Sequence, residues 1–168
     1  MKLRTFAFAA PLAALATATA AVAQSWTTYQ SEQHGFEVLV PPGFEPDAEP
    51  SVNGERGFAL PSGAAELALS AGPSEVDITF LVYADQFQDF LVNAGWTIER
   101  EEAADWVTLS GTAGESVIRI RIEPRCGDRM MAFMLLYAAA VAAEIEPLIP
   151  ELDAGLSEGD CSVTPEDD

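Results

Sequence analysis

The stretch SVIRIRIEPRCGDRMMAFMLLY, residues 116–137, decides the fold. Isoleucines alternate with charged side chains from Ile118 to Glu123, which is the pattern of a strand with one buried and one polar face. Residues 130–136 are instead apolar at every position, as expected of a central strand that is covered on both sides. The sequence therefore predicts two neighbouring strands, one central and one half exposed, joined by a short turn.

Further strand patterns surround this stretch. In residues 36–40, the side chains at 36, 38 and 40 share one apolar face, and the following Pro-Pro-Gly ends the strand because proline cannot continue a ladder. Residues 57–60 and 65–71 flank a Pro-Ser-Gly turn and predict a hairpin with Leu67 and Leu69 facing the core. Two more strand patterns, at 96–100 and 106–111, complete an antiparallel meander.

One segment before the meander has helical periodicity. Ser74 and Asp77 resemble a capping box, and apolar residues then recur at helical spacing until Gly95. Residues 76–83 are rich in β-branched and aromatic side chains, so a strand followed by a shorter helix is the alternative.

A second helical segment spans residues 138–154 and is interrupted by Pro147 and Pro150. Proline is tolerated only in the first turn of a helix. We therefore expect a short helix, a break near Glu146 and a second helix with Pro147 in its first turn.

Residues 1–23 have the features of a cleavable export signal. Lys2 and Arg4 precede an uncharged Ala/Leu/Phe run, and the segment ends in the small-x-small pattern Ala-Val-Ala that signal peptidase accepts. We expect cleavage between Ala23 and Gln24 and a periplasmic or secreted product. The alternative is an uncleaved membrane anchor, but the apolar run is short and rich in alanine. No membrane span is expected after cleavage.

The mature chain would be strongly acidic. The sequence has 8 basic and 27 acidic residues, and removing Lys2 and Arg4 leaves 6 arginines against 27 acids, a formal net charge of −21. This charge argues against binding to nucleic acid or to anionic lipid, both of which need Lys and Arg. A partner selected by charge would be cationic; alternatively, the acids only keep the protein in solution.

The mature length suits one domain. We expect a polar lead-in at residues 24–33, a single α+β domain at 34–161 and a disordered acidic tail at 162–168. The expected architecture is one antiparallel β-sheet of about six to seven strands flanked by helices. We expect a monomer.

Cys126 and Cys161 are the two cysteines of the chain. In an oxidising compartment, an isolated pair is most simply one disulfide. Redox and metal chemistry are the alternatives, but the chain has no Cys-x-x-Cys, and no histidine lies beside either cysteine.

Several packing and turn motifs resemble one known family. They are Tyr29, Gly35-Phe36, the run Val40-Pro41-Pro42-Gly43-Phe44, the segment WVTLSG at 106–111, Leu136-Tyr137, and Glu146-Pro147-Leu148-Ile149. Together they resemble the PsbP/Mog1-like domain family, which includes small exported proteobacterial proteins of unknown function. The resemblance covers most of residues 29–156 and implies an α/β/α sandwich.

The resemblance implies little about activity. The best-known members of the family are a photosystem accessory protein and a binder of a nuclear-transport GTPase, and no motif of either activity occurs here. Where relatives often have Tyr-Asp-Pro before the last helix, this chain has Ile145-Glu146-Pro147.

The sequence predicts no catalytic residue, cofactor or metal site. His34 is the only histidine, and no Gly-x-Ser-x-Gly motif occurs. Acidic residues cluster at 99–105 and 151–160, but no EF-hand loop fixes their geometry, so we interpret them as a solvated surface rather than a calcium site.

Arg119 and Arg121 form a candidate contact face on one side of a strand. In so acidic a chain they either pair with carboxylates on neighbouring strands or contact an anion or a protein. Trp96 and Trp106 pack at strand starts or, alternatively, form a ligand platform.

The sequence favours an exported, non-enzymatic binding or accessory domain of the cell envelope with a protein partner. A periplasmic hydrolase that uses carboxylates is the second hypothesis, and a secreted inhibitor or stress-response factor is the third. Two convergent carboxylates in a pocket would indicate the hydrolase, and an exposed apolar patch beside Arg119 and Arg121 would indicate a protein partner.

Overall fold

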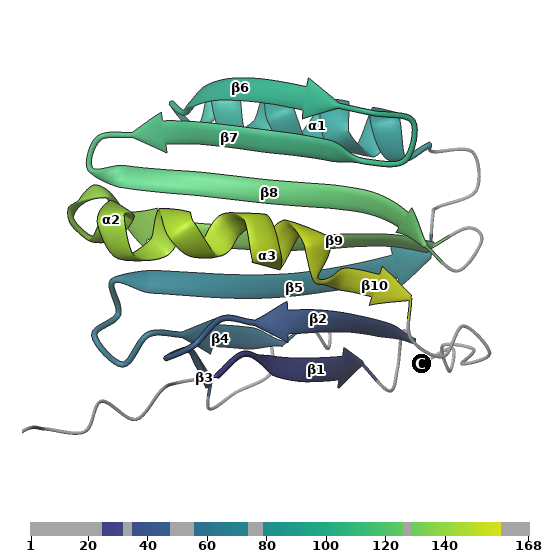
Figure 1. Cartoon of the computed structure of the whole chain (residues 1–168). Helices are drawn as coiled ribbons and strands as arrows, with labels where there is room; N and C mark the ends of the chain where they lie inside the picture. Colours follow the sequence, from purple (N-terminus) through teal and green to yellow (C-terminus); the bar gives the residue numbers. More distant parts are fainter. Residues whose placement is uncertain (1–24, 32–34, 48–55, 74–78, 126–128, 159–168) are drawn as a thin grey trace, which may run out of the picture.

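A computed structural model describes residues 25–31, 35–47, 56–73, 79–125 and 129–158. The predicted cleavage site Ala23/Gln24, His34, Cys126, Cys161 and the acidic tail lie outside these residues. Figure 1 shows the arrangement of the chain, with one large sheet and further elements on both of its faces.

The large sheet has seven strands in the order β3-β4-β5-β9-β8-β7-β6, and all neighbours are antiparallel. The predicted meander and hairpin are confirmed. Strand β9 is the central strand, as its two apolar faces predict. The strands are β3 (Glu45–Pro46), β4 (Gly57–Ala59), β5 (Ala65–Pro73), β6 (Thr97–Glu102), β7 (Val107–Ala113), β8 (Ser116–Arg125) and β9 (Arg129–Ala138).

A second, three-stranded antiparallel sheet was not predicted. It consists of β1 (Thr27–Ser31), β2 (Phe36–Val40) and β10 (Leu156–Glu158), with β2 in the middle. The apolar face of β2 packs against the large sheet, and therefore β2 lies over that sheet instead of joining its edge.

The polar lead-in predicted for residues 24–33 is corrected, because it contains strand β1. Tyr29 attaches this otherwise polar strand to the core. Its ring packs edge-on against Phe36 and Phe58, with centroid distances of 6.3 and 5.5 Å, so β1 has one apolar anchor among polar residues.

Different elements cover the two faces of the large sheet (Figure 1). The first face lies against the small sheet and the C-terminal helices, and its core includes Phe133, Leu135 and Leu152. The second face packs against helix α1 (Phe80–Asn93), and its core includes Leu91, Leu109 and Ile120. Helix α1 packs against β6, β7 and β8, so it lies over one side of this face.

Helix α1 begins later than predicted. Thr79 is its N-cap, and the Thr79 hydroxyl accepts a hydrogen bond from the Val82 N–H at 3.3 Å. The alternative strand is wrong for residues 80–83, which are helical; Ser74 and Asp77 lie outside the described residues. The predicted end is confirmed: Gly95 has φ +92°, the left-handed conformation that glycine adopts without strain.

The C-terminal segment is broken as its prolines predict. It consists of a 3₁₀ turn η1 (Ala139–Val141), α2 (Ala142–Ile145), a second 3₁₀ turn η2 (Glu146–Leu148) and α3 (Ile149–Ala154). Pro147 lies in the first turn of η2, and Pro150 in that of α3. Among the described residues, no helix is both long enough and apolar enough to cross a membrane.

Candidate functional site

Arg119 points from β8 to the helix on the first face of the sheet. Its Nε donates a hydrogen bond to Asp153 Oδ1 at 3.0 Å, a second guanidinium nitrogen pairs with Asp153 Oδ2, and a third donates to Ser110 Oγ at 3.0 Å. The Arg119 and Asp153 side chains are 19% and 18% exposed. The partner therefore lies on α3, not on a neighbouring strand as expected.

Arg121 lies two residues further along the same face of β8. Its Nε contacts Glu123 Oε1 at 2.5 Å, and its guanidinium carbon lies 4.5 Å from the centroid of the Trp106 ring, a cation–π geometry. The Glu123 side chain is 3% exposed. Arg121 is thus held between a buried carboxylate and an aromatic ring.

Both arginines of the predicted contact face are engaged within the protein. Because their charges are compensated by Asp153 and Glu123, neither Arg119 nor Arg121 presents a free guanidinium group to a ligand. Their role in contacting a partner remains a prediction, and the apolar surface that would support it lies elsewhere.

The predicted acidic clusters are spread along elements instead of converging. Glu99 and Glu101 lie on β6, and Glu151 and Asp153 on α3. Among the residues that the structure describes, no group of three or more His, Cys, Asp or Glu side chains could hold a metal ion. On the other face of β6, Arg100 pairs with Asp85 of α1 at 2.5 Å and ties that helix to the sheet.

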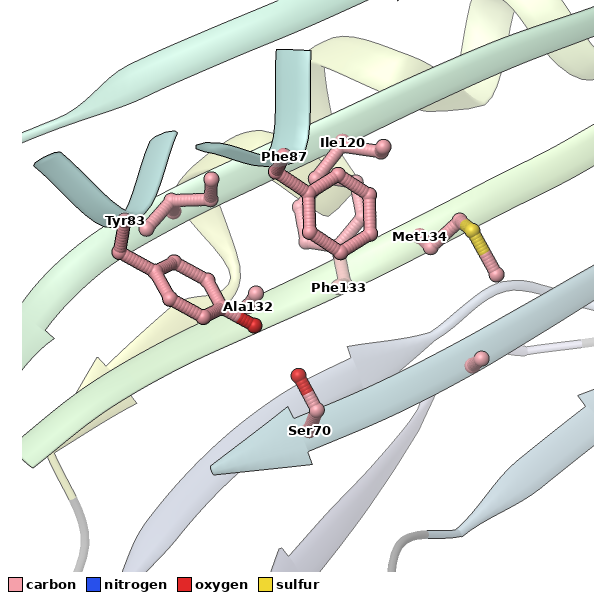
Figure 2. A pocket seen from close by; sticks show the side chains of 9 residues that line it. Ser70, Tyr83, Phe87, Ile120, Ala132, Phe133 and Met134 are labelled. Carbon is pink, nitrogen blue, oxygen red and sulfur yellow. The ribbon is translucent and has the colours of Figure 1, made fainter. Parts of the chain in front are cut away.

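A pocket opens beside helix α1 on the second face of the sheet (Figure 2). Its volume is about 260 Å³. Figure 2 shows Tyr83 and Phe87 of α1 on one side and Ser70 of β5 on the other, with the Tyr83 and Ser70 hydroxyl oxygens toward the same end. Among the described residues, the lining consists of Ala68, Ser70, Tyr83, Phe87, Ile120, Ile122, Ala132, Phe133 and Met134, and none of these nine is charged.

The pocket forms because α1 covers β6, β7 and β8, whereas the strands beside them, β5 and β9, carry small side chains at this level of the sheet. Ala68 and Ser70 of β5 and Ala132 of β9 leave space beside the helix. Large side chains would fill that space, as Ile120 does closer to α1.

Several apolar side chains of α1 face solvent, and one of them, Phe90, contacts the pocket residue Phe87. Phe90 is 66% exposed, and Leu81, Val82 and Val92, also on α1, are 39%, 42% and 51% exposed. The pocket was not predicted from the sequence. One feature of the sequence could have indicated an apolar surface here, because residues 80–92 contain more apolar side chains than the buried face of one helix can accommodate.

Other large side chains lie in or beside the two cores. Trp96 is half-buried against the core of the second face, and Met131 is buried in the core of the first. Met134 lies on the second face and lines the pocket. Tyr137 is buried, and burial, together with the negative charge of Glu146, raises the pKa of its hydroxyl, while Arg119 opposes the shift.

The fold is similar to two solved structures. The solution structure of cyanobacterial PsbP (CyanoP) from Synechocystis sp. PCC 6803 aligns with a TM-score of 0.59 at 16% identity, covering 86% of this chain and 98% of that chain. A mutant of the protein Mog1 aligns with a TM-score of 0.58 at 14% identity, covering 83% of this chain and 98% of that chain.

These likenesses show the fold alone, because the sequence identities are low. The PsbP/Mog1-like fold and the α+β class inferred from packing motifs are confirmed. No protein-family model matches the sequence, and no match was found among the curated proteins.

Proposed function

We propose that this protein of PsbP/Mog1-like fold is an exported, periplasmic domain that works by binding a protein of the cell envelope and catalyses no reaction. The observation that best supports binding is the pocket beside α1, whose described lining residues carry no charge, with the exposed ring of Phe90 next to it. Contiguous exposed apolar surface is costly in water and marks interaction sites.

The chemistry of the pocket fits binding better than hydrolysis. A hydrolase without histidine would need two carboxylates facing one cavity. The described side chains of the pocket beside α1 offer two hydroxyl groups and are otherwise apolar. In a second hollow, over β6 and β7, Glu99 is the one carboxylate among the described lining residues.

Export is the second part of the proposal and rests on the sequence pattern of residues 1–23. In the compartment that export implies, Cys126 and Cys161 would form one disulfide. Expression of the full chain, cell fractionation and intact mass with and without reductant test this part. We expect a periplasmic or secreted product that begins at Gln24 and gains two hydrogens on reduction; a full-length cytoplasmic product with free thiols would refute it.

Binding is tested by crosslinking in intact cells. The tagged protein should recover the same envelope protein in repeated experiments, and that protein, used as bait, should recover this chain. A carboxylate-dependent hydrolytic activity, lost in Glu99→Gln, would favour the hydrolase instead.

A further inference from the structure

The wall of the pocket continues along α1 as a row of aromatic rings. Tyr83 and Phe87 have ring centroids 6.1 Å apart, and Phe87 and Phe90 have centroids 6.3 Å apart. The rings are spaced four and three residues apart, so they lie on one flank of the helix. Tyr83 and Phe87 line the pocket, and Phe90 extends the same flank into solvent.

The floor continues beside this row. Along β5, residues two apart face the same side, so Glu66 points to the face of Ala68 and Ser70. Glu66 is exposed and pairs in register with Leu136 of β9, a half-buried apolar residue on the same face. On this face of β5 the side chains thus run from Ser70 and Ala68, which line the pocket, to the carboxylate of Glu66. The pocket together with this row of side chains is called the groove below.

The size of the pocket favours inserted side chains over a free small molecule. Small-molecule sites typically measure roughly 300–1,000 Å³, and this pocket measures about 260 Å³ and is continuous with exposed Phe90. Such a geometry suits one or two anchoring side chains of a longer polypeptide.

Two exposed carboxylates lie near the groove among the described residues. Glu66 lies at its end, and Asp89 precedes Phe90 on α1 and points about 100° around the helix from it, toward solvent. Arg100, which also faces this side of the sheet, already pairs with Asp85 and Glu102. A second copy of the chain would bring a large net negative charge of its own, so like-charge repulsion disfavours it as the occupant.

We propose that the groove between α1 and β5 binds a segment of another protein in which apolar side chains are flanked by Lys or Arg. The apolar residues enter the pocket against Tyr83 and Phe87, and the basic residues lie against Glu66 and Asp89. The exposed ring of Phe90 contacts both the apolar and the cationic groups. This inference rests on the proposed binding function and names its partner chemistry.

A direct test uses the mature protein and a labelled amphipathic peptide of leucine and lysine, with fluorescence anisotropy as the readout. Binding should saturate at one peptide per chain and weaken with added salt. Peptides with glutamate in place of lysine, or serine in place of leucine, should bind at least about tenfold more weakly.

Variants locate the site. Phe90→Ser and Ala68→Leu should each weaken the binding about tenfold or more, because the first removes an anchor and the second fills the pocket. Val92→Ser is the matched control, since Val92 is exposed on α1 but lies away from the aromatic row. Glu66→Arg should weaken the binding, and Glu151→Arg, on α3 over the other face, should not. Thermal unfolding verifies that each variant is folded.

Several outcomes would overturn the proposal. These are equal effects of Phe90→Ser and Val92→Ser, non-saturating peptide binding, self-association that Phe90→Ser abolishes, and Phe90-dependent binding to neutral phosphatidylcholine vesicles. If Phe90→Ser still captures the same envelope protein in cells as the wild type does, then that protein binds outside the groove. In that case the inference about the groove fails and the proposed binding function stands.

Discussion

The contact between Arg119 and Asp153 joins the central part of the sheet to the last helix. It is bidentate and less than one-fifth exposed at both ends, whereas the ion pair of Arg100 with Glu102 has a carboxylate that is 57% exposed. Bidentate pairs that are shielded from water contribute more than pairs at the surface.

A double-mutant cycle with Arg119→Met and Asp153→Leu should give a coupling energy of about 2 kcal/mol in urea unfolding. The same cycle for Arg100→Met and Glu102→Leu should give less than about 1 kcal/mol, because water screens that pair. Equal coupling energies would contradict a structural role for the Arg119 pair.

Thr108 is a polar residue whose replacement should stabilise the protein. Its side-chain oxygen is buried and has no hydrogen-bond partner among the described residues. An unsatisfied buried hydroxyl costs free energy, and valine has nearly the same shape. Thr108→Val should raise the free energy of unfolding by about 1 kcal/mol, whereas Thr108→Ala, which also leaves a cavity, should not; a less stable valine variant would show that the hydroxyl has a partner.

Alkaline pH should destabilise the protein through Tyr137. Burial raises the pKa of its hydroxyl in the folded state. Because the folded pKa is above the unfolded one, the stabilisation is complete below about pH 10 and is lost as the pH rises through the folded value. The free energy of unfolding in urea should fall more steeply above about pH 10 in the wild type than in Tyr137→Phe, and identical slopes would count against this residue.

At the scale of elements, the start of α1 shows how local sequence motifs compete. The Ser-x-x-Asp spacing predicted a cap at Ser74, but the helix begins at Phe80 behind Thr79. Both sites have a side-chain oxygen that can serve as a cap. The buried residues Ala84 and Leu91 lie within both the predicted and the observed helix, so burial does not distinguish between the two caps.

Thr79→Ala should therefore lower the free energy of unfolding by about 1 kcal/mol, since it removes the acceptor for the Val82 N–H. Thr79→Ser keeps that acceptor and should be close to wild type. The measurement is urea unfolding followed by far-ultraviolet circular dichroism, and a neutral Thr79→Ala variant would place the effective cap elsewhere.

Strands were predicted more accurately than the layers they form. The alternation in β8 and the two-sided apolar run in β9 define local environments, and both strands lie where those environments require. Strand β1 was missed because its one large apolar side chain, Tyr29, packs against Phe36 and Phe58. The sequence of residues 27–31 alone does not show these contacts. The pocket was missed for the same reason, because it forms where small side chains from β5 and β9 meet beside α1.

At the scale of the whole molecule, the acidic excess acts against stability. Exposed acids are distributed over β6, α1 and α3. The sequence has 27 acids against 8 bases, so most acids cannot each have a basic partner. Like charges that are held close together by folding repel one another.

Added salt should therefore raise the thermal midpoint. Sodium chloride and potassium chloride at equal ionic strength should raise it equally, because both screen charges. Sodium chloride should raise the midpoint less in a variant that replaces exposed acids by amides, for example Glu101→Gln with Glu151→Gln. A midpoint that falls as salt is added would contradict net repulsion in the folded state.

The position of β5 beside β9 has a consequence for the time course of folding. Strands β6 to β9 follow one another closely in the sequence and pair with their neighbours in the chain, whereas β5 pairs with β9 across α1 and the whole meander. Long-range pairing is slow because a large loop must close first. The apolar residues Leu67 and Leu69 of β5 therefore stay exposed to water during folding until β9 has formed. We expect the pairing of β5 with β9, which joins the two halves of the sheet, to be the slowest step of folding.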